Sequence, residues 1–193
     1  MESTIFLVLV VIAAIALYII KIHNDIISMH NTVKRSWADV VTAEKNKLSK
    51  IPSITEIAEK AANQEVSLIE HVTALRNSIS KLEKGQNNTM DYEALMLAEA
   101  STQNIQKGLS FVMEAYPEFQ ASGLYRNLMQ EMVDANDHTE ASIRMFNRNV
   151  EFFNTQISVF PNVWVNDMFS RRTQIKEFSD SKTSKTFEYS PNI

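Results

Sequence analysis

Residues 5–20 read IFLVLVVIAAIALYII, sixteen consecutive apolar residues near the start of a chain of 193 residues. At about 1.5 Å per residue, a helix of this length spans roughly 24 Å, slightly less than a bilayer core of about 30 Å. Lys21 can extend its amine to the headgroups, and Tyr18 lies where an interfacial aromatic residue is expected. The stretch predicts a transmembrane anchor over residues 1–22 that binds the lipid bilayer.

Two other kinds of segment are equally apolar, a cleaved signal peptide and a buried core helix. The sequence argues against both. A cleaved signal peptide needs a basic start and a small-residue cleavage site, whereas this chain has Glu2 and the poor site Tyr18-Ile19-Ile20-Lys21. A core helix of a soluble domain would restrict its apolar residues to one stripe. The sequence therefore favours a retained, single-pass membrane helix.

Basic residues flank the anchor on one side. The terminal amine alone precedes it, whereas Lys21, Lys34 and Arg35 follow within the distance that determines orientation. This asymmetry predicts that the large C-terminal part lies in the cytoplasm, beneath the cell's inner (cytoplasmic) membrane.

The rest of the composition is that of a helical domain. Apolar residues make up 45% of the chain, while glycine occurs 3 times and proline 4 times, which favours long helices with few turns. Cysteine is absent, so disulfides, thiol nucleophiles and thiolate metal sites are excluded. The net charge of −4 gives no reason to expect nucleic acid as a partner.

Apolar residues after the anchor recur at alternating steps of four and three, the spacing typical of packed helices. We expect four helices: from the anchor to about residue 49, from Ser53 to the turn at Gly85, over residues 89–116, and over residues 124–160. Ile51-Pro52 is expected to end or kink the first of them, since proline lacks a donor and restricts its predecessor. The fold class is all-α: a transmembrane helix followed by a long antiparallel bundle over residues 23–168, with residues 169–193 as an extended or partly disordered tail.

Polar residues interrupt the predicted apolar faces. Glu44 does so on the first helix, and a polar core layer is predicted from Glu65, Thr102, Asn136 and Thr139. We favour a hydrogen-bonded layer that fixes helix register. The alternative, which stays open, is a polar ligand pocket in the middle of the bundle.

Motifs for chemistry are missing. None of the four histidines follows an acidic residue at the Glu-x-x-His spacing of metal-binding bundles, and no phosphate-binding glycine loop or nucleophile motif occurs. General acid–base catalysis usually needs a second titratable group near the first, and the seams show none. The sequence predicts no catalytic residue, no metal and no cofactor.

Three motifs resemble the LemA family. Trp37 is followed fourteen residues later by Ile51-Pro52, and Gln64-Glu65 leads to Val72-Thr73 and Leu75-Arg76. The most specific motif is Glu114-Ala115-Tyr116-Pro117-Glu118, which precedes the pairs Phe146-Asn147 and Phe153-Asn154 and the triplet Phe160-Pro161-Asn162. The chain departs from the family pattern at Gln64, where histidine is common, and at Phe146 and Phe153, where tyrosine is usual. It resembles a divergent member.

The resemblance implies a bacterial protein with one membrane helix and a long helical bundle. Family members often occur near membrane zinc metalloproteases of the HtpX type, and most lack an assigned activity. We expect a non-enzymatic scaffold or adaptor that assembles with itself or with such a protease, and the alternative is a ligand-sensing bundle that uses the polar layer near Glu65. Membrane confinement favours a homo-oligomer. Candidate contacts between copies are the apolar residues that lie off the seams, Ile69, Phe152 and Trp164.

Overall fold

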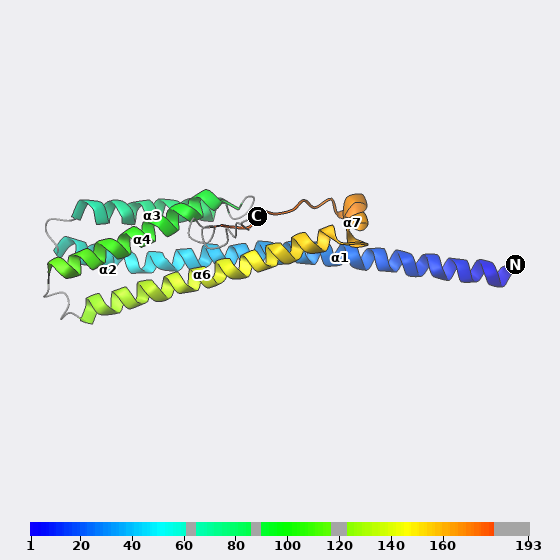
Figure 1. The fold of residues 1–193 in the computed structure, drawn as a ribbon, viewed down its shortest axis with the longest axis horizontal. Coiled ribbons are helices and arrows are strands. Elements are labelled where there is room, and N and C mark those ends of the chain that lie inside the picture. Colours follow the sequence, from blue (N-terminus) through cyan, green and yellow to red (C-terminus); the bar gives the residue numbers. More distant parts are fainter. Residues whose placement is uncertain (61–64, 86–89, 117–122, 180–193) are drawn as a thin grey trace, which may run out of the picture. The chain divides into compact units, whose positions relative to one another are not determined.

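The N-terminal half of the chain begins with one very long helix. In this computed structural model, which describes residues 1–60, 65–85, 90–116 and 123–179, α1 covers Glu2–Lys47 (Figure 1). The turn η1 (Leu48–Lys50) and the helix α2 (Ile51–Lys60) continue it directly. Helices account for well over two thirds of the described residues, and no strand occurs among them. The predicted all-α class is therefore confirmed.

Pro52 does not break this helix. The chain stays helical from Glu2 to Ile57, so the helical run does not end at Ile51-Pro52, although a separate helix, α2, begins at Ile51, close to the predicted start at Ser53. The backbone instead tightens to a 3-10 turn at η1, immediately before the proline. Proline fits the first turn of a helical segment because its missing N–H is not needed there.

The remaining helices follow the predicted order with one further difference. α3 covers Glu65–Gly85, α4 covers Tyr92–Ala115 and α6 covers Gly123–Ser158. The predicted second helix is thus divided between α2 and α3, and residues 61–64 lie outside the described part. Asp91 caps α4, since its carboxylate accepts a hydrogen bond from the Ala94 amide at 2.9 Å. Two short helical segments follow, α7 (Asn162–Val165) and η2 (Asn166–Ser170).

The chain forms two compact units, and both α1 and α6 contribute to each of them. The first unit consists of residues 1–36 and 145–177. Within it α1 and α6 pack through side chains at steps of about one helical turn, and the His30 and Phe153 rings lie 5.6 Å apart. Its buried apolar residues are Ile22, Ile26, Val33, Phe146, Val150, Phe153, Ile157 and Val165.

The second unit consists of the described residues from 37 to 144 together with Phe178 and Ser179. Here α3 and α4 pack closely, because a Cβ on Gly108 would lie only 3.2 Å from Leu68 Cδ1. The predicted seam of α3 is confirmed as core: Leu68, Val72, Leu75, Ile79 and Leu82 are all buried. Phe178 is buried as well and contacts Tyr92, so this part of the predicted tail is packed.

Candidate functional site

The most unusual feature of the second unit is a buried ion pair on α1. Lys47 Nζ donates a hydrogen bond to Glu44 Oε1 at 2.7 Å, and both side chains are 0% exposed. The residues are three positions apart, so one face of α1 carries both charges into the core. Charged side chains are almost never fully buried unless they are paired, and here the pairing satisfies that condition.

Lys47 compensates only partly for the burial of Glu44. Burial raises the pKa of Glu44, while the charge and hydrogen bond of Lys47 oppose that rise. The second carboxylate oxygen, Oε2, is buried and finds no hydrogen-bond partner among the described residues. A buried polar atom without a partner costs about 1–3 kcal/mol. The site therefore holds a destabilising group that the rest of the core must offset.

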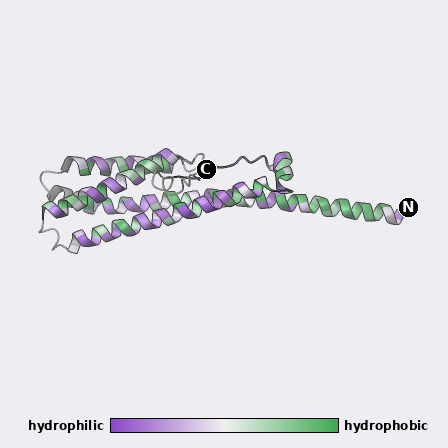
Figure 2. Ribbon diagram, in the orientation of Figure 1, coloured by the Kyte–Doolittle hydropathy of each residue, from purple (hydrophilic) through white to green (hydrophobic). Residues whose placement is uncertain are grey.

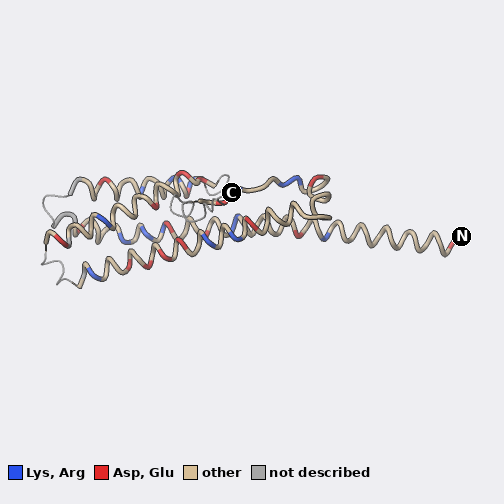
Figure 3. Tube along the Cα trace, in the orientation of Figure 1, with Lys and Arg blue, Asp and Glu red and all other residues tan. Residues whose placement is uncertain are grey.

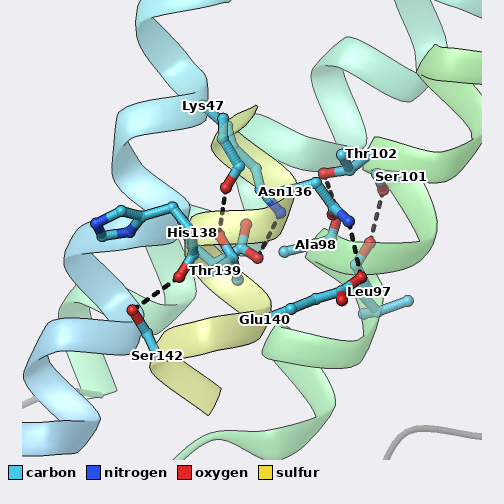
Figure 4. A network of polar contacts seen from close by, with 12 residues as sticks. Lys47, Leu97, Ala98, Ser101, Thr102, Asn136, His138, Thr139, Glu140 and Ser142 are labelled. Carbon is cyan, nitrogen blue, oxygen red and sulfur yellow. Dashed lines mark hydrogen bonds and ion pairs between the residues drawn. The ribbon is translucent and has the colours of Figure 1, made fainter. Parts of the chain in front are cut away.

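Two of the four predicted polar-layer residues lie in the core near this pair. Thr102 and Thr139 are both 0% exposed, and each donates its hydroxyl to a carbonyl of its own helix, Ala98 at 2.9 Å and Ala135 at 3.1 Å. Figure 4 shows Lys47 of α1, Thr139 of α6 and Thr102 of α4 in one layer. Because both hydroxyls are already satisfied within their helices, they do not compete for Glu44.

The other two predicted residues contribute differently. Asn136 is only half-buried, and its amide bonds Glu140 on the same helix at 2.9 Å, along the outside of α6. Glu65 begins α3, but its side chain lies outside the part that the structure describes. Sequence reasoning noted Glu44 as an interruption and missed Lys47 as its partner. The signal available was the spacing of an acid and a base three residues apart on an apolar face.

Open grooves line the outside of the second unit. One, of about 310 Å³, lies between α1 and α6 beside the exposed ion pair of Lys50 Nζ and Glu131 Oε2 at 2.8 Å, and His138 also lines it. Another, of about 350 Å³, lies between α3 and α4 and is lined by His71 and Phe111 among others. Both are shallow and mixed in polarity, so their chemistry selects no particular ligand.

An aromatic cluster closes the core of this unit. The rings of Trp37 and Tyr92 meet edge to face at 5.4 Å, and Phe178 lies 6.0 Å from Tyr92. Burial raises the pKa of Tyr92 to about 12. The phenol therefore stays neutral at physiological pH and serves packing rather than proton transfer.

The first unit carries a long, continuous stretch of exposed apolar side chains at the start of α1. Side chains over residues 5–12 are 50–70% exposed, and burial begins only at Ile22. Figure 2 shows this end of α1 as continuously hydrophobic, and Figure 3 shows it without charge between Glu2 and Lys21. By length and composition it is the one helix of the described chain that could cross a membrane. An N-terminal signal sequence would show the same properties.

Histidines do not gather into a metal site. Within residues 1–60, 65–85, 90–116 and 123–179, no group of three or more histidine or acidic side chains is placed to hold a metal ion. His23 Nδ1 lies 2.8 Å from Ser170 Oγ, and His30 packs against Phe153. Burial lowers the pKa of His30, and the charges of Arg172 and Lys34 lower it further. His30 is therefore held in its neutral form inside the first unit.

These features describe an all-α protein with one exposed apolar N-terminal helix and a packed helical bundle. The LemA family model matches residues 36–190, and the chain belongs to the LemA family. A curated relative, Protein LemA from Metamycoplasma hominis, is 22% identical over 143 residues. The match covers 74% of this chain and 61% of that protein. No solved structure matches the chain. The resemblance inferred from the sequence motifs is confirmed.

Proposed function

We propose that this LemA-family protein is a membrane-anchored scaffold or adaptor without catalytic activity of its own. The observation that carries the proposal is the continuity of α1. One regular helix begins as an apolar stretch exposed on all sides and continues, without a break, into the packed core of the bundle. A continuous helix of this kind keeps a bundle close to a membrane surface.

The exposed stretch needs an apolar environment. Leaving a large apolar side chain in water rather than burying it costs about 1.5–3 kcal/mol, and residues 5–20 are almost all of this kind. Ile22 and Ile26, in the next turns of the same helix, are buried at 6% and 0% exposure. Because the folded unit begins directly after Lys21, a cleavage there would cut a regular helix at its junction with the core. This supports a retained anchor rather than a removed signal.

Flanking charge supports a cytoplasmic position for the bundle. Lys34 and Arg35 follow the anchor on the side of the folded units, and Lys21 lies at the end of the apolar stretch. Basic residues near a membrane helix are retained on the cytoplasmic side. We place the protein in the inner (cytoplasmic) membrane on this basis.

The buried ion pair supports a structural role for the core. Glu44 and Lys47 are both 0% exposed, so neither charge faces a substrate in the solvent. Buried polar and ionic groups are best known for fixing helix register. A fixed register preserves the outer surface of the bundle, which is the part that a scaffold presents to partners.

The proposed partners are a second copy of the chain and a membrane metalloprotease of the HtpX type. Ile69 and Phe152, which the sequence put off the seams, are 42% and 56% exposed. Confinement to one plane raises the effective concentration of such surfaces, so weak contacts suffice for assembly.

Four measurements on the full-length protein test this proposal. The protein should resist carbonate extraction, and protease added outside intact cells should leave the chain after Gly85 uncut. Affinity purification from gently solubilised membranes should recover a stoichiometric protein partner. Mass photometry in nanodiscs should show oligomers. Extraction by carbonate would refute the anchor, cleavage from outside would refute the orientation, and a monodisperse monomer at all concentrations would refute self-association.

A ligand-sensing bundle is the second candidate, and one observation favours it. Glu44 Oε2 is buried without a hydrogen-bond partner in the described structure, so a small donor admitted by a local opening of the helices would relieve it. Native mass spectrometry of the gently purified protein tests this. A retained small molecule that is lost in Glu44→Gln supports sensing, whereas identical masses for both proteins oppose it.

A further inference from the structure

Four large apolar side chains are exposed together at the end of the first unit. Phe160, Trp164, Met168 and Phe169, here called the apolar foot, are 70%, 66%, 68% and 54% exposed. The rings of Phe160 and Trp164 meet edge to face at 5.0 Å, so the two aromatics form one surface. The prediction that Phe160 belongs to the buried seam of α6 was wrong, because the helix ends at Ser158 before reaching it.

The apolar foot is held in one orientation by hydrogen bonds behind it. Asn166 donates to the Arg172 carbonyl at 2.9 Å and accepts from the Arg172 amide at 3.0 Å. Asn154 makes the same pair of bonds with Ile175, at 2.8 and 2.9 Å. Val165 is buried on the inner side of α7 while Trp164 points outward. The exposed side chains are thus presented by a fixed backbone, which lowers the entropy cost of binding.

The position of the foot along α1 is also fixed. His23 lies two residues after Lys21, the last exposed residue of the anchor. Its Nδ1 lies 2.8 Å from Oγ of Ser170, which ends η2. A groove of about 290 Å³ in the same region is lined by both Asn162 of α7 and Ile22 of α1. At about 1.5 Å per residue, both α1 positions lie within one helical turn of Lys21. Figure 1 shows α7 beside this part of α1.

The chemistry of the foot fits the boundary between lipid headgroups and acyl chains. Tryptophan is enriched at that boundary, where its ring is partly apolar and its N–H stays hydrated. Arg171 is exposed directly after η2, and Arg172 follows it. Asp167 is the one acidic residue in the sequence from 160 to 172, so this segment carries a net positive charge suited to anionic lipids.

We infer that α7 and η2 form a second membrane contact, in which the apolar foot inserts into the leaflet from which α1 emerges. The inference rests on the proposed membrane anchor and adds to it. A single helix leaves the bundle free to rotate and tilt about one point, whereas a second contact beside it fixes both. The alternative occupant of the foot is a second copy of the chain, and it is distinguished by the test below.

The test uses tryptophan fluorescence of the full chain in vesicles of phosphatidylcholine mixed with phosphatidylglycerol. Lipids brominated at shallow acyl carbons replace part of the phosphatidylcholine. The variant Trp164→Phe reports Trp37 alone and gives the baseline. The Trp164 emission is the emission of the wild type minus that of Trp164→Phe. We expect the brominated lipids to lower it roughly twofold, since interfacial groups lie about 5–10 Å into the headgroup and acyl boundary.

A matched control places tryptophan elsewhere in the same unit. Met145 is 54% exposed on α6 and lies thirteen residues before the end of that helix at Ser158, roughly 20 Å along the helix. Met145→Trp in the Trp164→Phe background should show only the baseline quenching. Equal quenching of wild type and Trp164→Phe would overturn the inference. The Trp164 emission could instead be blue-shifted, unquenched and dependent on the protein-to-lipid ratio. That result would assign the foot to a second copy of the chain and would also overturn the inference.

The same vesicles separate the two proposals. Carbonate resistance together with absent Trp164 quenching leaves the anchor in place and rejects the second contact. Loss of the protein into the carbonate supernatant rejects the anchor, and the second contact falls with it.

Discussion

α1 presents two opposite exceptions to the usual distribution of residues. Over residues 5–20 it exposes apolar side chains, whereas at Glu44 and Lys47 it buries charged ones. Each exception violates the preference for apolar interiors and polar surfaces. The first requires an environment outside the chain, and the second requires a partner within it. The comparison shows that exposure in a single chain cannot be judged without knowing what surrounds it.

The largest expected effect comes from breaking the buried pair. Lys47→Met leaves Glu44 as an uncompensated buried carboxylate and should lower the free energy of unfolding by about 3–5 kcal/mol. Replacing both residues, Glu44→Leu with Lys47→Met, should be neutral or stabilising by about 1–4 kcal/mol. Denaturant unfolding in mild detergent measures both. A double variant as unstable as the single one would contradict this account of the pair.

A charge in the exposed apolar stretch should have the next largest effect. Ile12→Arg puts a guanidinium near the middle of the predicted membrane span, at a cost of about 2.5–3.5 kcal/mol. The fraction of protein that resists carbonate extraction should fall clearly, while the control Ile12→Val should retain it. A side chain that already faces water would tolerate the arginine, so unchanged extraction would contradict a bilayer around this stretch.

Removing one of the asparagine side chains that hydrogen-bond the backbone behind the apolar foot should lower stability moderately. Asn154→Ala loses two hydrogen bonds to Ile175, each contributing about 0.5–1.5 kcal/mol. Hydrogen exchange at the Ile175 amide should become faster. Asn136→Ala, which removes an exposed bond to Glu140, should leave that amide unchanged. Equal exchange in wild type and Asn154→Ala would show that other contacts hold this segment.

Acid should weaken the first unit through His30. The pKa of His30 in the folded protein is below its ordinary value of 6.5, so the unfolded chain takes up a proton first as pH falls. The stability that neutral His30 contributes is therefore fully present above pH 6.5. It is lost as the pH falls from 6.5 toward the lowered pKa of the folded protein. His30→Leu should flatten this dependence in thermal unfolding, and Arg172→Gln should reduce it by removing one of its causes. A steeper loss in His30→Leu would contradict the assignment.

The smallest effect is expected from an exposed ion pair near the buried one. Lys45 Nζ and Glu83 Oε1 lie 2.6 Å apart, with side chains 60% and 38% exposed. A double-mutant cycle should give a coupling energy of only about 0.2–1 kcal/mol, and salt should reduce it further. Coupling as strong as that of the buried pair would mean that burial is not what distinguishes them.

The sequence predicted the helices well and their breaks less well. Four-three spacing identified the faces of α3 and α6 because a buried helical face must recur with each turn. Pro52 did not end the helical run, because its missing N–H falls in the first turn of α2, directly after the tightened turn η1. Phe160 was misjudged because the spacing that predicts a seam continues past the residue where the helix ends.

The candidate sites were predictable only in part. Thr102 and Thr139 were expected in a polar layer and lie in the core, while the charges that dominate that layer, Glu44 and Lys47, were not paired in advance. A lysine three residues after a glutamate is usually a solvated surface pair. The arrangement of neighbouring helices decides whether such a pair faces water or the core.

By itself the sequence determined the helical class, the family and the apolar N-terminal helix, because each depends on composition and local spacing. Only the tertiary structure decided which charges are buried and which apolar residues stay exposed. It joined His23 to Ser170, residues 147 positions apart, and so placed the end of η2 beside the end of the apolar stretch. Contacts at such separations depend on how whole helices pack, and no local pattern in the chain encodes them.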